Sequence, residues 1–269
     1  MFFSAIIHFM NWAFKRQVSD LFILIIIFGA FGFLIAYPFL NEEPTCMDGK
    51  QNGREIGVDC GGTCVRACIA EVDPVSVLWS RAFRVVHGRY NAVAYLENHN
   101  QSTAVNKINY QFRFADANNI YIGKRDGSAF IPPGGNFVIF EPGIDIGNSI
   151  PVYTTFEFTQ TPQWLQVSQE KIDQLKILVS NIQLVNETIF PKLSATIKNN
   201  SLFTIPNMDV IAILYDMSGN AISASRTFLD QINPLQSTDI NFTWPEPLSG
   251  KVVVKEIIPM YNIFSAQLK

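Results

Sequence analysis

The hydrophobic pattern changes along the chain, and it begins with a single uninterrupted apolar run. No charged residue occurs in 21–37, and with Pro38, Phe39 and Leu40 the run reaches twenty residues. A helix that rises ~1.5 Å per residue needs about this length to cross a hydrocarbon layer of ~30 Å. Because backbone polar groups in lipid must be paired within the segment, we expect a transmembrane helix over 18–40.

Two features indicate that this helix is a retained signal anchor and set its orientation. A cleaved signal peptide has a shorter apolar region, roughly 7 to 15 residues, that ends in an A-x-A-like site. Neither feature fits this run. Lys15 and Arg16 precede the run, and basic residues favour the cytoplasmic side. We therefore expect a single-pass protein of the cell membrane, with a cytoplasmic N-terminus and with residues 41–269 extracytoplasmic.

The segment 1–17 has a pattern of its own. Ser4, His8, Asn11 and Lys15 are spaced by four, three and four residues, so on a helix they form one polar stripe among apolar positions. This favours an amphipathic helix at the cytoplasmic interface of the membrane. The alternative is that the segment is only a hydrophobic start to the signal anchor.

From Val77 onward, apolar residues recur at every second position, which is typical of strands with one buried face. The expected strands occupy 79–86, 92–96, 108–114, 120–122, 136–140 and 152–158. Turn signals separate them at Gly88, 116–119, Asp126-Gly127, 132–135 and Pro142-Gly143. Short strands at this spacing predict a mainly β protein with an antiparallel, immunoglobulin-like sandwich over 75–160.

The same markers return about one hundred residues later. The segment 193–197 matches 92–96, and 210–216 matches 110–116. The single markers pair Asn100 with Asn200, Asp116 with Asp216, Pro132 with Pro234, and Glu141-Pro142 with Glu246-Pro247. This order predicts a second sandwich over 175–269, joined to the first by a linker over 161–174.

Within the second copy, the alternation places particular residues in the core. We expect Val210, Ala212 and Leu214 to point inward and 252–254 to supply a late strand. Each copy has about ninety residues, which is enough for seven short strands around one core. We therefore expect that neither copy needs the other to bury its apolar face.

All four cysteines, Cys46, Cys60, Cys64 and Cys68, fall in the segment 41–72. This segment is too short and too rich in Gly and Asp to build a core, so in an oxidising compartment we expect a small knob closed by two disulfides. The competing zinc site lacks the usual pair of C-x-x-C knuckles. Four cysteines allow three pairings, and the spacing does not choose among them.

The stretch 46–64 reads C-M-D-G-K-Q-N-G-R-E-I-G-V-D-C-G-G-T-C. It resembles a motif, C-x-D-G-x-x-N-G-x-E-x-G-V-D-C-G-G-x-C, of prokaryotic surface and secreted proteins. Asp48, Asn52, Glu55 and Asp59 place four oxygen-bearing side chains among glycines, a composition suited to calcium. Asp-Gly and Asn-Gly turns give the same pattern without an ion. No other cofactor is expected.

Four short motifs of the second copy resemble those of one domain family: 199–201 (N-N-S), 214–216 (L-Y-D), Gly219-Asn220 and Asn233-Pro234. They are similar to the FxLYD family of small immunoglobulin-like envelope domains, with Ala212 at the position of the leading Phe. The first copy keeps Phe112 and Asp116 but has Phe114 and Ala115 in place of Leu and Tyr. The resemblance implies a β-sandwich without catalytic activity, and it identifies no ligand.

Candidate chemistry on this scaffold is sparse. The extracytoplasmic histidines, His87 and His99, lie in no nucleophile motif, so we expect no enzyme. The part after the helix carries 18 basic and 22 acidic residues, which gives no reason to bind nucleic acid. We expect a structural or interaction protein that presents two immunoglobulin-like domains to an envelope or surface protein. The alternative is a glycan- or peptidoglycan-binding module that uses Trp164 or Trp244.

Overall fold

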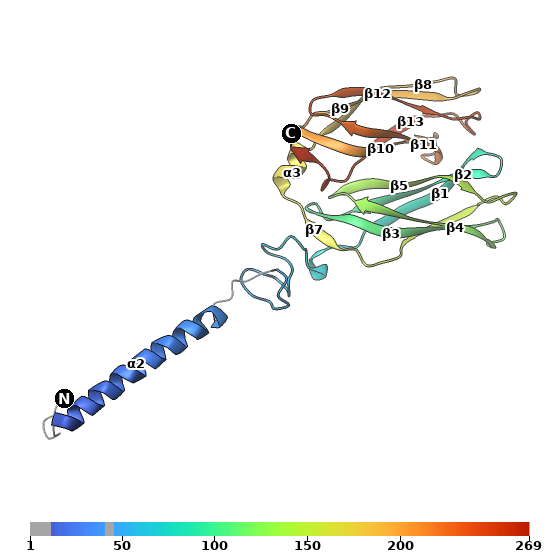
Figure 1. Cartoon of the computed structure of the whole chain (residues 1–269). Coiled ribbons are helices and arrows are strands. Elements are labelled where there is room, and N and C mark those ends of the chain that lie inside the picture. Colours follow the sequence, from blue (N-terminus) through green and yellow to red (C-terminus); the bar gives the residue numbers. More distant parts are fainter. Residues whose placement is uncertain (1–11, 41–45, 269) are drawn as a thin grey trace.

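The computed structural model describes residues 12–40 and 46–268. One long helix, α2 (Trp12–Leu40), projects from a mainly β body (Figure 1). Within it, Phe14–Tyr37 is long and apolar enough to cross a membrane, and none of its apolar window is buried against the rest of the described protein. The predicted apolar helix is confirmed and begins at Trp12, earlier than expected, and its passage through a membrane stays a prediction. Of the predicted polar stripe, Lys15 lies on α2, whereas Ser4, His8 and Asn11 lie outside the described residues.

The first copy, here called repeat 1, is a sandwich of two antiparallel sheets. One sheet has the order β1-β2-β5, and the other has the order β4-β3-β6 with β7 also paired to β3. Its strands are β1 (Ser76–Val86), β2 (Arg89–Asn98), β3 (Thr103–Ala115), β4 (Tyr121–Ile131), β5 (Gly135–Asp145), β6 (Tyr153–Phe158) and β7 (Trp164–Gln166). Alternate residues of β2 and β3, such as Ala94 and Phe112, are fully buried between the sheets.

The second copy, repeat 2, follows the short helix α3 (Gln169–Gln174) and has the same pairing order. Its sheets are β8-β9-β12 and β11-β10-β13, and β14 pairs with β10 as β7 pairs with β3. Its strands are β8 (Ile177–Val185), β9 (Lys192–Asn199), β10 (Phe203–Tyr215), β11 (Ala221–Ile232), β12 (Ser237–Thr243), β13 (Val254–Met260) and β14 (Gln267–Leu268). Val210, Ala212 and Leu214 are fully buried in its core, as predicted.

Two polar devices recur at equivalent places in the repeats. The Oδ1 atoms of Asp116 and Asp216 each accept two backbone N–H bonds at 2.8–2.9 Å and close the turn after β3 or β10. Asn98 and Asn199 are fully buried, and each Nδ2 donates to backbone carbonyls of the two following connections. Buried amides that satisfy loop carbonyls in this way fix the loop path.

The structure corrects part of the predicted alignment. The equivalent asparagines are Asn98 and Asn199, so the pairing of Asn100 with Asn200 is wrong. Glu141 lies opposite Ala92 in the ladder, and the equivalent ladder position in repeat 2 is Phe242, opposite Leu193. The match of Glu141-Pro142 with Glu246-Pro247 is therefore a coincidence of sequence.

Several predicted boundaries also differ from the observed ones. Asp126-Gly127 lies inside β4 and Pro142-Gly143 inside β5, because both strands continue well beyond their apolar centres. The late strand of repeat 2 begins at Val254. The predicted linker 161–174 contributes β7 to repeat 1 and also contains α3, whose N-terminus Ser168 caps.

The two repeats pack face to face, so that four sheets form one stack (Figure 1). The sheet β1-β2-β5 of repeat 1 contacts the sheet β11-β10-β13 of repeat 2. Ile211 and Ile213 of β10 belong to the same buried cluster as Val93 of β2 and are at most 1% exposed. The expectation that neither repeat needs the other to bury its apolar face is therefore wrong.

The knob, residues 46–72, is joined to repeat 1 by strand-like pairing. Arg66 bridges to Leu165, Ala67 N donates to Trp164 O at 3.0 Å, and Gln166 N donates to Val65 O at 2.6 Å. Its disulfides are Cys46–Cys64 and Cys60–Cys68, which confirms the two bridges and identifies the pairing.

Candidate functional site

A buried polar cluster lies inside repeat 1 and opens toward repeat 2. The Tyr110 hydroxyl on β3 donates to Glu141 Oε1 at 2.6 Å, and Arg125 Nε on β4 donates to Glu141 Oε2 at 2.9 Å. Tyr110 and Glu141 are 4% and 8% exposed. Burial, followed by the bond to Glu141, raises the pKa of Tyr110 far above its ordinary value. The hydroxyl therefore stays protonated and holds the carboxylate in place.

Gly127 makes room for this cluster. It stands opposite Tyr110 in the β3–β4 ladder, and a Cβ at this position would overlap both the Tyr110 hydroxyl and Glu141 Oε1. The glycine that the sequence offered as a turn signal is thus a strand residue required for close approach.

The cluster forms one wall of a cavity of about 350 Å³ between the repeats. The opposite wall comes from repeat 2 and includes Ile211, Met260, Asp209 and Arg226. The Arg226 guanidinium lies 5.8 Å from the centre of the Phe140 ring, and its Nη1 is 3.5 Å from Asp209 Oδ1. Desolvation raises the pKa of Asp209, and Arg226 opposes this shift. The cavity thus combines two guanidinium groups, two carboxyl groups and an apolar lining.

Repeat 2 has no such cluster at the equivalent positions. By ladder register, Tyr110 corresponds to Val210, Arg125 to Ser225, Gly127 to Thr227, and Glu141 to Phe242. Val210 and Phe242 are buried in an apolar core. The same fold therefore forms without the polar groups. The predicted alignment did not show this difference between the repeats, because it paired Glu141 with Glu246.

A second polar cluster ties the repeats together. Glu256 accepts a hydrogen bond from Tyr95 of repeat 1 and another from Tyr215 of repeat 2, each at 2.7 Å. Desolvation and the bond to Glu256 raise the pKa of Tyr95 to about 12 and also raise that of Tyr215. Arg81 donates to Ala221 O at 3.1 Å from the same face. These bonds fix the relative orientation of the two sandwiches.

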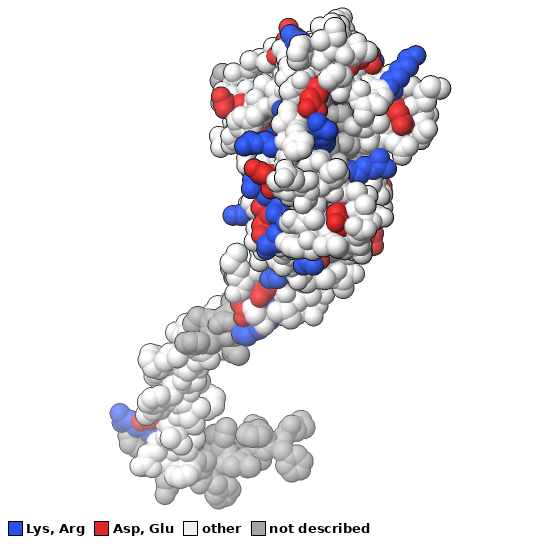
Figure 2. Space-filling model, turned by 90° about the vertical axis from the view of Figure 1, so that its right-hand side faces the viewer, with Lys and Arg blue, Asp and Glu red and all other residues white. Residues whose placement is uncertain are grey.

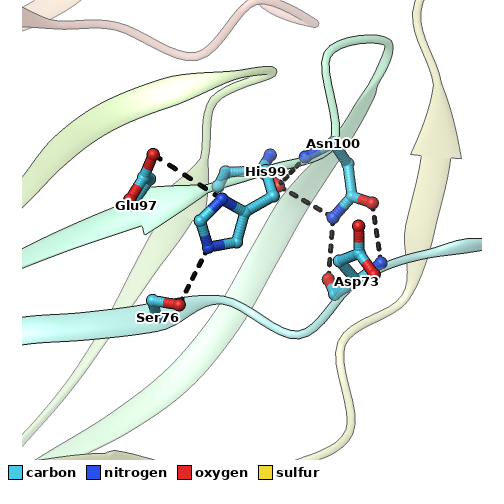
Figure 3. A network of polar contacts seen from close by, with 6 residues as sticks. Asp73, Ser76, Glu97, His99 and Asn100 are labelled. Carbon is cyan, nitrogen blue, oxygen red and sulfur yellow. Dashed lines mark hydrogen bonds and ion pairs between the residues drawn. The ribbon is translucent and has the colours of Figure 1, made fainter.

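Ser76, His99 and Glu97 come together at the ends of β1 and β2 (Figure 3). Ser76 Oγ lies 2.9 Å from His99 Nε2, and His99 Nδ1 lies 3.6 Å from Glu97 Oε1. The second distance is too long for a hydrogen bond. None of the three residues lines a cavity described here, and the histidine and carboxylate side chains are 42% and 37% exposed.

Nearby, Asn100 makes two hydrogen bonds with the backbone of Asp73. A strand-end polar network describes the group best, and His87 likewise lies exposed at a strand end.

In the knob, the four residues suggested for calcium are engaged with one another and with the backbone. The Asp59 carboxylate accepts from the amides of Asp48 and Gly49 at 3.0–3.1 Å, and Glu55 Oε2 accepts from the amides of Asn52 and Asp59. Asp48 Oδ2 accepts from Asn52 Nδ2 at 2.8 Å. Such bonds stabilise the turns directly, and calcium binding stays a prediction.

Glu55 also lies beside the sulfurs of Cys46 and Cys64. These two sulfurs form a disulfide and so have no thiolate to offer a metal.

The aromatic residues considered for glycan binding are buried. Trp164 and Trp244 are 5% and 7% exposed. On the face shown in Figure 2, acidic and basic side chains are interspersed over the sandwiches. That face therefore carries no large patch of a single charge sign.

Comparisons with known proteins show little similarity. No family model matches the chain, and no curated protein sequence matches it. One similar solved structure is that of red sea bream transglutaminase, at 9% identity and a TM-score of 0.23. The match covers 72% of this chain and 30% of the transglutaminase, so it says nothing of this chain's activity.

Proposed function

We propose that this protein is a membrane-anchored, extracytoplasmic interaction protein that displays a rigid pair of immunoglobulin-like domains to a protein of the cell envelope or surface. The observation that carries the proposal is the connection of the knob to the stack of two sandwiches. A disulfide-closed knob follows the helix, pairs with β7, and leads into two sandwiches joined by a buried interface. Such a body suits presentation of a surface at a fixed orientation.

Exposed apolar side chains at one end of repeat 1 support a protein partner. Ile120, Tyr121, Val152 and Tyr153 are 52–60% exposed. Tyr121 and Tyr153 both pair with Ala115, so they flank the end of β3. Exposed apolar groups that gather in this way are typical of interaction surfaces. The glycan-binding alternative loses its support because Trp164 and Trp244 are buried.

The resemblance to FxLYD domains and to the prokaryotic cysteine motif is the basis for the envelope setting. Lys15 and Arg16 at the start of α2 favour a cytoplasmic N-terminus. Protease added outside intact cells should digest the part beyond residue 41 and leave an N-terminal tag protected. Digestion of the tag with protection of the sandwiches would refute the proposed orientation.

The partner can be tested in the same membranes. A photo-crosslinking amino acid at Tyr121 should give a discrete protein adduct, whereas the same group at exposed Asn109 on the same sheet should not. Equal labelling from both positions would argue against a partner at this end.

A further inference from the structure

We propose that the cavity between the repeats binds a ligand with a free carboxylate on a small apolar group, held by Arg125 and Arg226. The cavity takes one arginine from each repeat, so the site exists only in the stacked pair. The inference does not depend on the membrane orientation or on the envelope partner proposed above.

The first argument is the internal comparison. Repeat 2 builds the same sandwich with Val210 and Phe242 where repeat 1 buries Tyr110 and Glu141. Replacement of buried polar groups and their partners by well-packed apolar residues is often neutral or stabilising, so the fold does not require Tyr110 and Glu141 at these positions. A buried carboxylate with its own hydrogen-bond donors, facing a cavity, fits a binding role better.

The second argument is the supply of donors. Arg125 uses Nε for Glu141, and its guanidinium has further N–H donors on a side chain that is 51% exposed. The Arg226 guanidinium lies over the Phe140 ring, 5.8 Å from its centre, and a guanidinium presents several N–H donors in one plane. Both guanidinium groups line the same cavity as Tyr110. They therefore converge on one space, and a planar guanidinium fork matches a carboxylate.

The remaining lining selects the ligand. Phe130, Phe140, Ile211 and Met260 offer apolar contact, and about 350 Å³ lies in the range of small-molecule sites, roughly 300–1,000 Å³. Glu141 and Asp209 balance the two arginines, so a dianion such as phosphate would meet more repulsion than a monoanion. A small organic acid and the C-terminus of a peptide that ends in an apolar residue share this chemistry.

The test uses the full chain in detergent micelles and isothermal titration calorimetry. N-acetylphenylalanine should bind saturably, whereas its amide and inorganic phosphate should bind at least ~10-fold more weakly, since loss of one charge-assisted pair is worth about that factor. Arg226→Gln should weaken binding by a similar factor, and Arg113→Gln, on the outer face of repeat 1, should not. Thermal melting checks that each variant is folded. If Arg226→Gln does not fold, Arg226→Lys replaces it in the test, because lysine keeps the charge but lacks the planar pair of N–H donors.

A pair of short peptides ending in Phe, one with a free and one with an amidated C-terminus, separates the two sources of the carboxylate. Tighter binding of the free peptide than of N-acetylphenylalanine assigns the site to chain ends, and weaker binding assigns it to small acids. The proposal is overturned if N-acetylphenylalanine does not bind, if its amide or phosphate binds equally well, or if the folded Arg226 variants bind like the parent protein.

Discussion

The two repeats share every strand pairing, yet they differ in what they bury. Repeat 1 buries Tyr110 and Glu141, the latter paired with half-exposed Arg125, and repeat 2 has the apolar residues Val210 and Phe242 at the positions of the two buried ones. What the repeats have in common are the Asp116 and Asp216 turns and the buried Asn98 and Asn199. The comparison teaches that the turn and loop devices specify the fold, whereas the composition of the core can change to suit another role.

The repeats also use opposite sheets to meet each other. Repeat 1 contributes β1-β2-β5, and repeat 2 contributes β11-β10-β13, so the contact is head to tail. The two outer faces are polar. One has the pairs Arg113–Glu157 and Lys124–Asp126, and the other presents Ser194, Thr196, Asp239 and Asn241. Polar outer faces end such a stack, as capping units end repeat arrays.

The largest expected effect separates the two faces of β10. Ile213 faces repeat 1, its neighbour Leu214 faces the core of repeat 2, and both are fully buried. Either residue changed to Ala should cost about 2–5 kcal/mol of unfolding free energy in the full chain.

A double-mutant cycle with Val93→Ala sharpens this result. Val93 lies between Asn91 and Tyr95 on the face of β2 that contacts repeat 2. Asn91 donates to the Ala224 carbonyl and Tyr95 donates to Glu256, and Ala224 and Glu256 are the ladder partners of Ile213. Val93 therefore faces Ile213. We expect coupling of about 0.5–3 kcal/mol between Val93 and Ile213, and additivity between Val93 and Leu214. Urea denaturation measures both, and equal coupling would contradict the assignment of faces.

The next effect concerns the polar cluster. Gly127→Thr, which imports the residue of repeat 2, should destabilise by roughly 1–3 kcal/mol because it overpacks the Tyr110 hydroxyl. Adding Tyr110→Val, Arg125→Ser and Glu141→Phe should recover most of this loss, since the set reproduces the apolar core of repeat 2. If the four changes together are worse than Gly127→Thr alone, the equivalence of the two cores is wrong.

Alkaline pH should weaken the interface between the repeats. Folding raises the pKa of Tyr95 from 10.0 to about 12, and Tyr215 and Tyr110 shift in the same direction. Between these values the folded state binds more protons than the unfolded state, so stability is full below pH 10 and falls as the pH rises toward 12. Tyr95→Phe should flatten this decline in urea titrations, whereas Tyr121→Phe, an exposed control, should leave it unchanged.

The smallest effect on the sandwiches is expected from the knob. Non-reducing peptide mapping should find Cys46–Cys64 and Cys60–Cys68. Cys60→Ser with Cys68→Ser should increase proteolysis of 46–72 and shift the unfolding free energy of the sandwiches by no more than ~0.5 kcal/mol, because the knob adds little beyond the small Ala67 side chain to the buried core of repeat 1. A large drop in sandwich stability would show that the knob is part of the folding unit.

The sequence predicted elements whose signals are local. The apolar run gave α2, the alternation gave β2, β3 and β10, and the one-hundred-residue offset gave the repeat. Edge strands such as β4 were shortened because Asp126-Gly127 resembles a turn, and β7 was missed because a three-residue strand has no period. Tyr110, Glu141 and Arg125 come from three strands, and only the sheet register brings them together.

The face-to-face packing was also beyond local patterns. Residues 211 and 213 lie on the face of β10 opposite its own core, and both are isoleucine, so the strand is apolar on both sides. A continuous apolar run of this kind indicates burial on two faces, as in sheets covered on both sides. The segment 210–214 has this signal, whereas the alternation of Val210, Ala212 and Leu214 alone predicts one buried face.

The central claim is that the two repeats form one cooperative body. Hydrogen exchange measured by mass spectrometry during urea unfolding of the full chain reports the unfolding of β2 and of β9 separately. The first strand belongs to the interface sheet of repeat 1 and the second to the outer sheet of repeat 2. The account predicts a common midpoint for both strands in the full chain and lower midpoints for residues 75–169 and 171–269 when each is expressed alone. Two separate midpoints in the full chain, each equal to that of the isolated fragment, would contradict it.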